Sequence, residues 1–133
     1  CIVNKEIVSS IEHGLMLLVG FTHTDSEKEV EKMALKIAKL RIFEDSSGKM
    51  NLSVKDAGGS ILSISQFTLY ANSKDGNRPS FVQAMNPKIA FELYEKFNQK
   101  IKSLGIPIYS GIFGADMKLD IICDGPVTIH LEY

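Results

Sequence analysis

Two segments of the chain carry apolar residues at the three- and four-residue spacing of an amphipathic helix. The first opens with the capping-box spacing of Ser26 and Glu29, and its apolar stripe consists of Val30, Met33, Ala34 and Ile37. The second opens at Asn86-Pro87, an N-cap followed by proline at the first helical position, and ends before Gly105 and Pro107. Its stripe consists of Ala90, Leu93, Tyr94, Phe97, Ile101 and Leu104. The pattern predicts two main helices.

Strand patterns occupy much of the remaining chain. Residues 15–19 form a continuous apolar run, and such a run is typical of a buried strand. Residues 61–67 alternate large apolar and small polar side chains, as a half-buried strand does. Shorter strands are predicted over residues 1–3, 40–43, 107–110, 117–123 and 127–131. Residues 45–48 and 72–79 are rich in Asn, Asp, Ser and Gly, which favours a turn and a loop.

The order of these elements is strands, helix, strands, helix, strands, without a steady β-α-β alternation. A chain of 133 residues has the length of one domain. We therefore predict a single α+β domain over residues 1–133. We expect a mostly antiparallel, barrel-like sheet at its core, with both helices packed on one side.

Composition narrows the functional classes. A hydrophobic fraction of 44% and a charged fraction of 23% are those of an ordinary globular protein. Cys1 and Cys123 have neither the spacing of a zinc site nor enough partners for a disulfide framework, which suits a reducing compartment. The longest apolar stretch, residues 15–21, is too short to span a bilayer, and no signal-peptide pattern precedes it. We predict a cytoplasmic protein that uses no metal and no cofactor.

The net charge of −1 argues mildly against extensive nucleic-acid binding, because phosphate contacts require cations. A local patch is still possible, since Lys74 and Arg78 share one loop. A second basic group lies on the later helix, where we interpret it as a solvated face: Lys88, Lys96, Lys100 and Lys102.

The usual catalytic constellations are missing. The histidines His13, His23 and His130 have no spacing that suggests a triad or a metal site, so structural roles are favoured for all three. The sequence contains no phosphate-binding glycine loop. Its acidic residues are scattered, and none can be paired as a general acid and base.

Two segments carry stronger signals. Hydrogen-bonding side chains gather at the end of a predicted strand in Ser65-Gln66-Phe67-Thr68-Leu69-Tyr70, where burial without partners would cost about 1–3 kcal/mol per group. The run Asp124-Gly125-Pro126-Val127-Thr128 places a Gly-Pro step between two predicted strands. A cis peptide is affordable there, and glycine lets a ligand approach the backbone closely. Each signal alone also fits an ordinary strand end or turn.

Together the two segments resemble the signature motifs of the D-aminoacyl-tRNA deacylase family, in its bacterial and eukaryotic type. Supporting similarity covers nearly the whole chain, in residues 40–45, 48–53, 78–81 and 113–117. The resemblance implies a homodimer that hydrolyses the ester between a D-amino acid and the 3′ end of tRNA, in translation quality control. It also implies action on glycyl-tRNA, and the acceptor end of aminoacyl-tRNA as the partner.

The resemblance further implies that Gly125 and Pro126 form a chiral filter with a cis peptide, inserted into the active site of the other subunit. Main-chain carbonyls there would hold the substrate's amino group so that an L side chain collides with the motif, whereas glycine has no side chain to collide. The opposite wall would be the catalytic segment Ser65-Gln66-Phe67-Thr68.

Within that wall, we expect the N–H groups of Phe67 and Thr68 to stabilise the developing oxyanion. A nucleophilic role for the Thr68 hydroxyl is the minor alternative, because no base accompanies it. Assistance by the 2′-OH of the terminal ribose fits that absence better. Arg78 and Phe81 would lie near the terminal adenosine, where Phe81 stacks on the base or is simply a core aromatic. Met117 is a further predicted substrate-binding residue.

The sequence departs from the family pattern at two points. Cys123 stands where the family commonly has Asn. The family's first strand, with an Arg that braces the Gly-Pro motif, would precede Cys1, and we expect the natural protein to have it. Two other functions stay open: a catalytically silent nucleic-acid-binding or regulatory module, and a conventional Ser/Thr esterase of small molecules.

Overall fold

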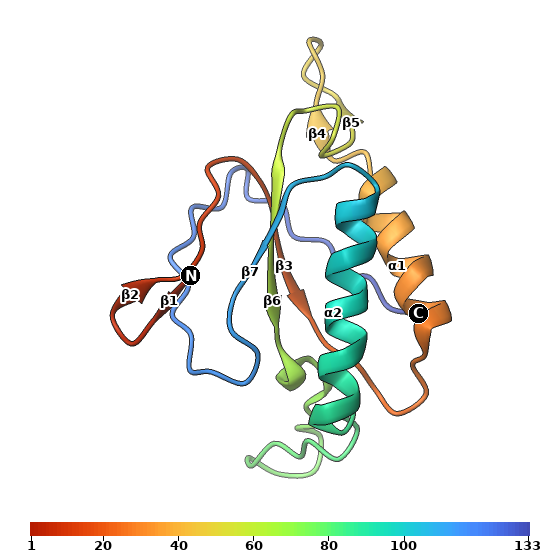
Figure 1. Cartoon of the computed structure of the whole chain (residues 1–133), viewed down its shortest axis with the longest axis vertical. Coiled ribbons are helices and arrows are strands. Elements are labelled where there is room, and N and C mark those ends of the chain that lie inside the picture. The colour runs from red at the N-terminus through yellow and green to blue at the C-terminus, as the bar shows by residue number, and fades with distance from the viewer.

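The computed structural model describes residues 1–133, that is, the whole chain. Its strands are β1 (Ile2–Val3), β2 (Glu6–Ile7), β3 (Gly14–Val19), β4 (Phe43–Glu44), β5 (Met50–Leu52), β6 (Ser60–Ser65) and β7 (Ile108–Ser110). Its helices are α1 (Glu27–Lys39), α2 (Pro87–Ser103) and the short 3₁₀ helix η1 (Phe67–Tyr70). Figure 1 shows the long strands at the centre, with α1 and α2 beside them.

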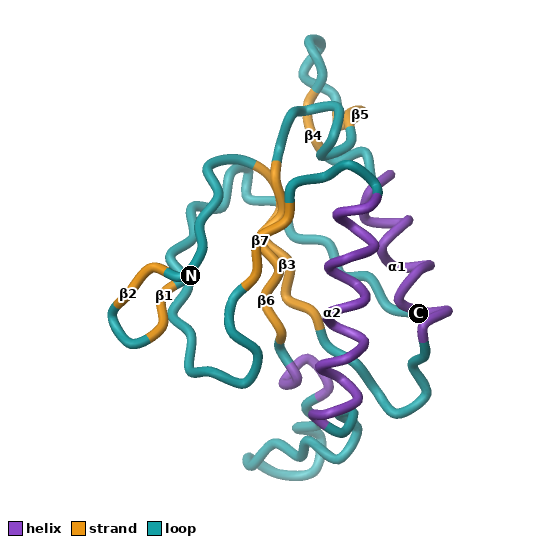
Figure 2. The backbone as a smooth tube through the Cα atoms, in the orientation of Figure 1, coloured by secondary structure: helices purple, strands orange, loops and turns teal.

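The central sheet is parallel. Its strands lie in the order β3-β6-β7, with Gly14 opposite Ser60 at one end of the first pair and Val19 opposite Ser65 at the other. Parallel neighbours need long crossover connections, and these contain α1 between β3 and β6 and α2 between β6 and β7. Both crossovers step in the same direction along the sheet, so their usual right-handedness places both helices on one face. Figure 2 shows this arrangement.

The predicted α+β class and the two helices on one side of the sheet are confirmed, but the mostly antiparallel, barrel-like sheet is wrong. The core sheet is parallel and open, and antiparallel pairing is limited to the two-stranded pairs β1–β2 and β4–β5 and to isolated bridges. These short hairpins interrupt the β-α-β order along the chain. The continuous apolar run in β3 was the better indicator, because strands of parallel sheets carry such runs.

The C-terminal third differs most from the prediction. The strand expected over residues 107–110 is present as β7, but residues 117–123 and 127–131 form no strands. Their one ladder contact is a bridge in which Ile2 and Lys118 exchange backbone hydrogen bonds of 2.8 and 2.9 Å. An alternating pattern becomes a strand only where a neighbouring backbone offers partners, and here too few are available.

Three other predicted boundaries shift. The strand expected over residues 40–43 is reduced to β4 at Phe43–Glu44, because α1 continues to Lys39. The strand expected to reach residue 67 ends at Ser65, and Phe67 opens η1. The strand expected over residues 1–3 appears as β1, in a hairpin with β2.

The caps of the two helices are confirmed. The Ser26 hydroxyl accepts from Lys28 N at 3.3 Å, and the Glu29 carboxylate accepts from Ser26 N at 2.7 Å, which completes the capping box. The Asn86 side chain accepts from Lys88 N at 3.0 Å. After Leu104 the chain turns at Gly105, whose φ of +82° favours glycine.

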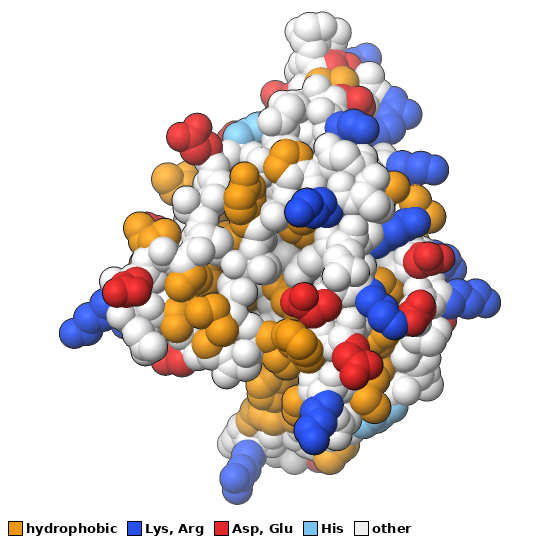
Figure 3. Space-filling view, in the orientation of Figure 1, with side chains coloured by type: hydrophobic (Ala, Val, Ile, Leu, Met, Phe, Trp, Pro, Cys, Tyr) orange, Lys and Arg blue, Asp and Glu red, His pale blue; other side chains and the backbone are white.

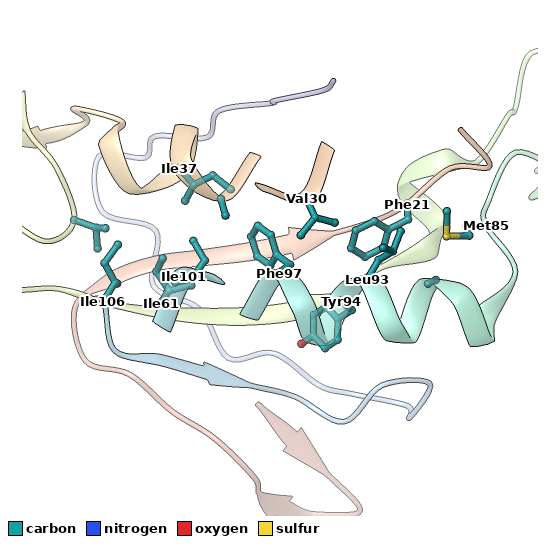
Figure 4. Packing of buried hydrophobic residues seen from close by; sticks show 13 residues of the cluster. Phe21, Val30, Ile37, Ile61, Met85, Leu93, Tyr94, Phe97, Ile101 and Ile106 are labelled. Carbon is teal, nitrogen blue, oxygen red and sulfur yellow. The ribbon is translucent and has the colours of Figure 1, made fainter. Parts of the chain in front are cut away.

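The main hydrophobic core lies between the sheet and the two helices. Figure 4 shows its side chains pointing inward from both layers. Its buried residues are Phe21, Val30, Ala34, Ile37, Val54, Ile61, Met85, Ala90, Leu93, Tyr94, Phe97, Ile101 and Ile106. Tyr94 satisfies its polar end by donating to the backbone carbonyl of Ser63 at 2.7 Å. The apolar stripes predicted for both helices therefore form the core, except that Met33 is only partly buried and Leu104 lies outside the cluster.

A smaller cluster covers the opposite face of the sheet. Leu62 and Ile64 of β6 pack there with Cys1, and Met16 and Met117 lie against them. The β1–β2 hairpin and part of the C-terminal segment cover this face (Figure 1). The sheet thus has apolar material on both sides.

Both helices present charged side chains to the surface. In Figure 3, Lys, Arg, Asp and Glu side chains mix on the side formed by α1 and α2, while apolar patches gather elsewhere. Lys96 pairs with Glu27 of the neighbouring helix, and Lys88 and Lys102 are exposed, in agreement with the predicted solvated face. Neither helix combines the length and apolar character needed to cross a membrane.

Candidate active site

The candidate site begins where β6 ends. Gln66 N donates to the Val19 carbonyl at 2.8 Å, which extends the β3–β6 pairing by one step before the chain turns into η1. Gly20 faces this turn, and a Cβ at that position would lie 2.8 Å from the Gln66 carbonyl oxygen. A side chain at residue 20 would therefore push the two backbones apart. Glycine holds this turn close to β3.

The turn leaves two backbone donors free. Phe67 and Thr68 open η1, where the first N–H groups have no acceptor within the helix. Neither N–H donates to a side chain or to another segment of the chain, although Leu69 N and Ala71 N bond back to the Gln66 and Thr68 carbonyls. Two adjacent free donors at a strand end are the arrangement that an oxyanion requires.

The side chains of the turn hold one another. The Gln66 amide donates to the Thr68 hydroxyl oxygen. Because an oxygen that accepts such a bond has less electron density to offer a carbonyl carbon, this contact favours a positioning role for Thr68. Ser65, at the last step of β6, is half-buried.

Phe81 is brought to the same place from the loop before α2. Its ring meets Phe67 edge to face, with centroids 5.1 Å apart and planes at 67°. With 38% of its surface exposed, Phe81 is not a core residue, so that alternative is wrong. An aromatic face that stays accessible beside the free N–H groups is suited to contact with a base.

Arg78 lies in the loop that leads to Phe81. Asn72 and Ser80 close this loop by exchanging two backbone hydrogen bonds of 2.8 Å each. The Arg78 guanidinium is exposed and makes no ion pair or hydrogen bond within the chain. It is therefore available to an anionic ligand.

The electrostatic environment beside the turn is acidic. Burial raises the pKa of Asp25, and the nearby charges of Glu29 and Glu132 add to this, although a hydrogen bond from Thr22 N (2.8 Å) opposes it. Burial also raises the pKa of Tyr70, with Asp25 and Glu132 contributing. These groups place negative charge next to η1, and Asp25 is a residue that no sequence motif indicated.

The Gly125-Pro126 run lies in the C-terminal segment, which lines an open groove of the protomer. Its peptide bond is cis, the φ of Gly125 is +119°, and the whole of residues 121–130 is exposed. Gly125 and Thr128 line an open groove of about 1570 Å³ between β3 and the C-terminal segment. Leu69 and Tyr70 line the same groove, so the ends of the two predicted motifs share it within one subunit, without a hydrogen bond between the run and residues 65–68.

The other residues considered in the sequence have packing or surface positions. Met117 packs in the smaller cluster, with its sulfur 2.5 Å from where a Cβ on Gly111 would lie. Cys123 is exposed and Cys1 is buried, and both are free thiols. His13 packs edge to face on Phe43, and exposed His130 lies 3.4 Å from Glu132.

The sequence matches a family model and relatives of known name over nearly its whole length. A family model described as D-Tyr-tRNA(Tyr) deacylase matches residues 1–132. The chain is 57% identical over 130 residues to a "D-aminoacyl-tRNA deacylase" of Brevibacillus brevis, covering 98% of this chain and 90% of that protein. It is 54% identical to the protein of the same name from Geobacillus sp., covering 98% and 86%.

Two solved structures share the fold. One, entitled "c-Myc DNA Unwinding Element Binding Protein", superposes with a TM-score of 0.93 at 42% identity, over 99% of this chain and 90% of that one. The other, described as a probable eukaryotic D-amino acid tRNA deacylase, has a TM-score of 0.69 at 17% identity, covering 86% and 83%. The second likeness concerns the fold alone.

Proposed function

The chain belongs to the D-Tyr-tRNA(Tyr) deacylase family, and from this premise we propose how it works. It is a hydrolase of the ester bond of D-aminoacyl-tRNA, and so it serves translation quality control. The observation that carries this function is the family match over residues 1–132, which includes both segments singled out in the sequence. The finer points below are our proposals, and we place the reaction in the cytoplasm, where aminoacyl-tRNA is used.

We propose that residues 65–68 form the wall against which the ester lies. As water attacks the carbonyl carbon, negative charge develops on the carbonyl oxygen, and the N–H groups of Phe67 and Thr68 stabilise it. A preorganised donor of this kind is worth about 2.7–4 kcal/mol of barrier in acyl transfer. The Gln66–Thr68 hydrogen bond supports the geometry of the turn.

The proton transfers use the substrate itself. The protein offers no general base beside Thr68, so the vicinal 2′-OH of the terminal ribose relays a proton from the attacking water to the departing 3′ oxygen. The products are the free D-amino acid and tRNA with its 3′-OH restored. Phe81 and Arg78 contact the terminal adenosine, Phe81 by stacking and Arg78 by its charge. Met117 contributes indirectly, through its packing under β6.

Chirality is read by Gly125 and Pro126 of the partner subunit. Main-chain carbonyls of this run accept hydrogen bonds from the substrate's α-amino group, and an L side chain would then collide with the motif. Glycine has no side chain to collide, so glycyl-tRNA mischarged on tRNA-Ala is also hydrolysed. The exposure of residues 121–130 supports delivery of the run to a second copy.

The decisive experiment follows ester hydrolysis on D-Tyr-tRNA, L-Tyr-tRNA and glycyl-tRNA. Rapid loss of the D and glycyl esters, with L at the spontaneous rate, is expected. Equal loss of D and L esters would exclude the chiral filter, and loss of neither would favour a binding module without catalysis. D-Tyr-tRNA ending in 2′-deoxyadenosine tests the chemistry, because its hydrolysis at the normal rate would eliminate the 2′-OH relay.

A further inference from the structure

The segment between Phe81 and α2 has no regular secondary structure, yet its position decides where the Phe81 ring lies. Burial holds only its end at Met85, since 77% of the Val82 surface and 38% of the Phe81 surface are exposed. We refer to residues 81–85 as the Phe81 strap. Something other than core packing must order the exposed part of this strap.

That role falls to the turn between β3 and α1. Phe21 accepts a backbone hydrogen bond from Met85 at 3.0 Å, and Thr22 bridges to Ala84. Two side chains complete the attachment. The Thr22 hydroxyl donates to the Gln83 carbonyl at 2.6 Å, and the His23 ring donates from Nε2 to the Val82 carbonyl at 2.6 Å.

The two side-chain bonds differ in kind from the backbone bonds, because substitutions can remove them without changing the chain path. The Asp25 carboxylate supports the turn by accepting from Thr22 N at 2.8 Å. In Figure 1, the β3–α1 connection, η1 and the segment before α2 lie at the same end of the molecule. The turn between β3 and α1 therefore holds the strap, and the strap carries Phe81. The Phe81 ring in turn contacts Phe67, beside the free N–H groups of η1.

We propose that Thr22 and His23 are positioning residues, which hold the Phe81 strap so that the Phe81 ring is preorganised for the 3′-terminal adenosine of the tRNA. This inference rests on the proposed function. Neither side chain touches the reacting ester. Their loss should therefore weaken substrate binding, which each hydrogen bond supports through Phe81, and leave the chemical step nearly unchanged.

The test is steady-state hydrolysis of D-Tyr-tRNA by a set of variants. His23→Ala should raise KM about threefold to tenfold, as expected for one hydrogen bond, with kcat within about twofold of the wild-type value. His23→Gln places an amide donor near the Nε2 position and should restore KM. Thr22→Val, which lacks the hydroxyl, should resemble His23→Ala. His13→Ala is the control, since His13 precedes β3, packs on Phe43 and makes no contact with the strap, and it should have the wild-type KM.

A double-mutant cycle separates this role from a merely structural one. If His23 acts through Phe81, His23→Ala should not raise KM further in a Phe81→Ala background. An equal increase in both backgrounds would overturn the proposal, as would a wild-type KM for His23→Ala. Failure of His23→Gln to lower KM would also count against it. If the wild-type protein hydrolyses neither D-Tyr-tRNA nor glycyl-tRNA, the proposed function and this inference are both overturned. If the wild type is active and the variants have its KM, this inference alone is overturned.

Discussion

At the scale of single residues, glycines determine how closely segments approach around the site. A Cβ on Gly20 would lie 2.8 Å from the Gln66 carbonyl oxygen, so this residue sets the distance between β3 and the turn that opens η1. Gly125 combines a φ of +119° with a contact, since a Cβ there would lie 2.9 Å from Val127 Cγ2. A side chain at Gly20 is excluded by contact alone, whereas one at Gly125 is excluded by both backbone conformation and contact.

Gly125→Ala should reduce the hydrolysis of D-Tyr-tRNA by at least tenfold, because the new methyl group strains the backbone that, in our proposal, accepts hydrogen bonds from the substrate's amino group. Gly76→Ala is the matched control: its φ is also positive, at +100°, but nothing lies within 4 Å of the new Cβ. Initial rates at equal enzyme concentration measure both. Similar rates for the two alanine variants would mean that residue 125 has no special role.

Asp25→Asn should raise the melting temperature at neutral pH. Burial raises the pKa of Asp25 above 3.8, so the folded state binds this proton more tightly than the unfolded state. Stability is then lost as pH rises from 3.8 through the raised pKa, and the charged form is unfavourable at pH 7. Asparagine keeps an acceptor for Thr22 N and removes the charge.

Thermal unfolding of the Asp25→Asn variant and the wild type across pH measures this effect. The difference in melting temperature should shrink as pH falls toward 3.8, because both side chains become uncharged. A difference that stays constant with pH would show that the charge of Asp25 is not its cause.

At the scale of elements, local capping and crossover geometry act together. The capping box starts α1 close to the end of β3, and the Asn86–Pro87 start of α2 follows the Phe81 strap directly. Because both helices are crossover connections of a parallel sheet, their starting points determine where the intervening turns lie. The candidate site is therefore built from the turns at one end of the sheet.

Ser26→Ala should destabilise the protein by about 1 kcal/mol, the usual cost of losing an N-cap side chain. The Ser26 hydroxyl is also the largest cause of the lowered pKa of Glu29, so this pKa should return toward its ordinary value. Chemical denaturation measures the first effect and carboxyl chemical shifts the second. Ser26→Asp, which retains a capping oxygen, should keep most of the stability, and equal losses in both variants would contradict the cap explanation.

At the scale of the whole molecule, apolar surface remains uncovered. Large apolar side chains are exposed along the C-terminal segment, where 95% of the Ile122 surface is accessible and Val127 and Ile129 are also exposed. Several large exposed apolar side chains in one segment favour an interaction site. We propose a second copy of the chain as its partner, because the Gly125-Pro126 run belongs to the same segment.

Ile122→Lys should convert a dimer of twice the 14.7 kDa chain mass to a monomer and abolish hydrolysis of D-Tyr-tRNA. The cause would be a desolvated charge at the interface between copies. Ile7→Lys is the control, since Ile7 is also exposed, at 74%, but lies in the β1–β2 hairpin. Light scattering after size-exclusion chromatography measures the mass, and a fully active monomer would contradict delivery of the motif between subunits.

The sequence by itself determined the features whose signals are local. Helix starts were predictable because Ser26 and Asn86 cap their own chains within three residues, and the end of α2 follows from Gly105. Both segments of the proposed site were found by resemblance, since their residue types and spacing are preserved in the chain. The site residues adjacent to them, such as Asp25, had no such signature.

Only the tertiary structure decided which strands pair and which loops meet, because the pairing of distant segments cannot be inferred from the residues of either segment alone. Alternating residues 117–123 and 127–131 formed no strands for lack of backbone partners, and a parallel sheet replaced the expected antiparallel one because long crossovers join its strands. The contact of Phe81 with Phe67, and the hydrogen bonds from Thr22 and His23 that hold its strap, depend on loops separated by up to 61 positions in sequence. The family and its deacylase activity were therefore predictable from sequence, whereas the contacts that position Phe81 were not.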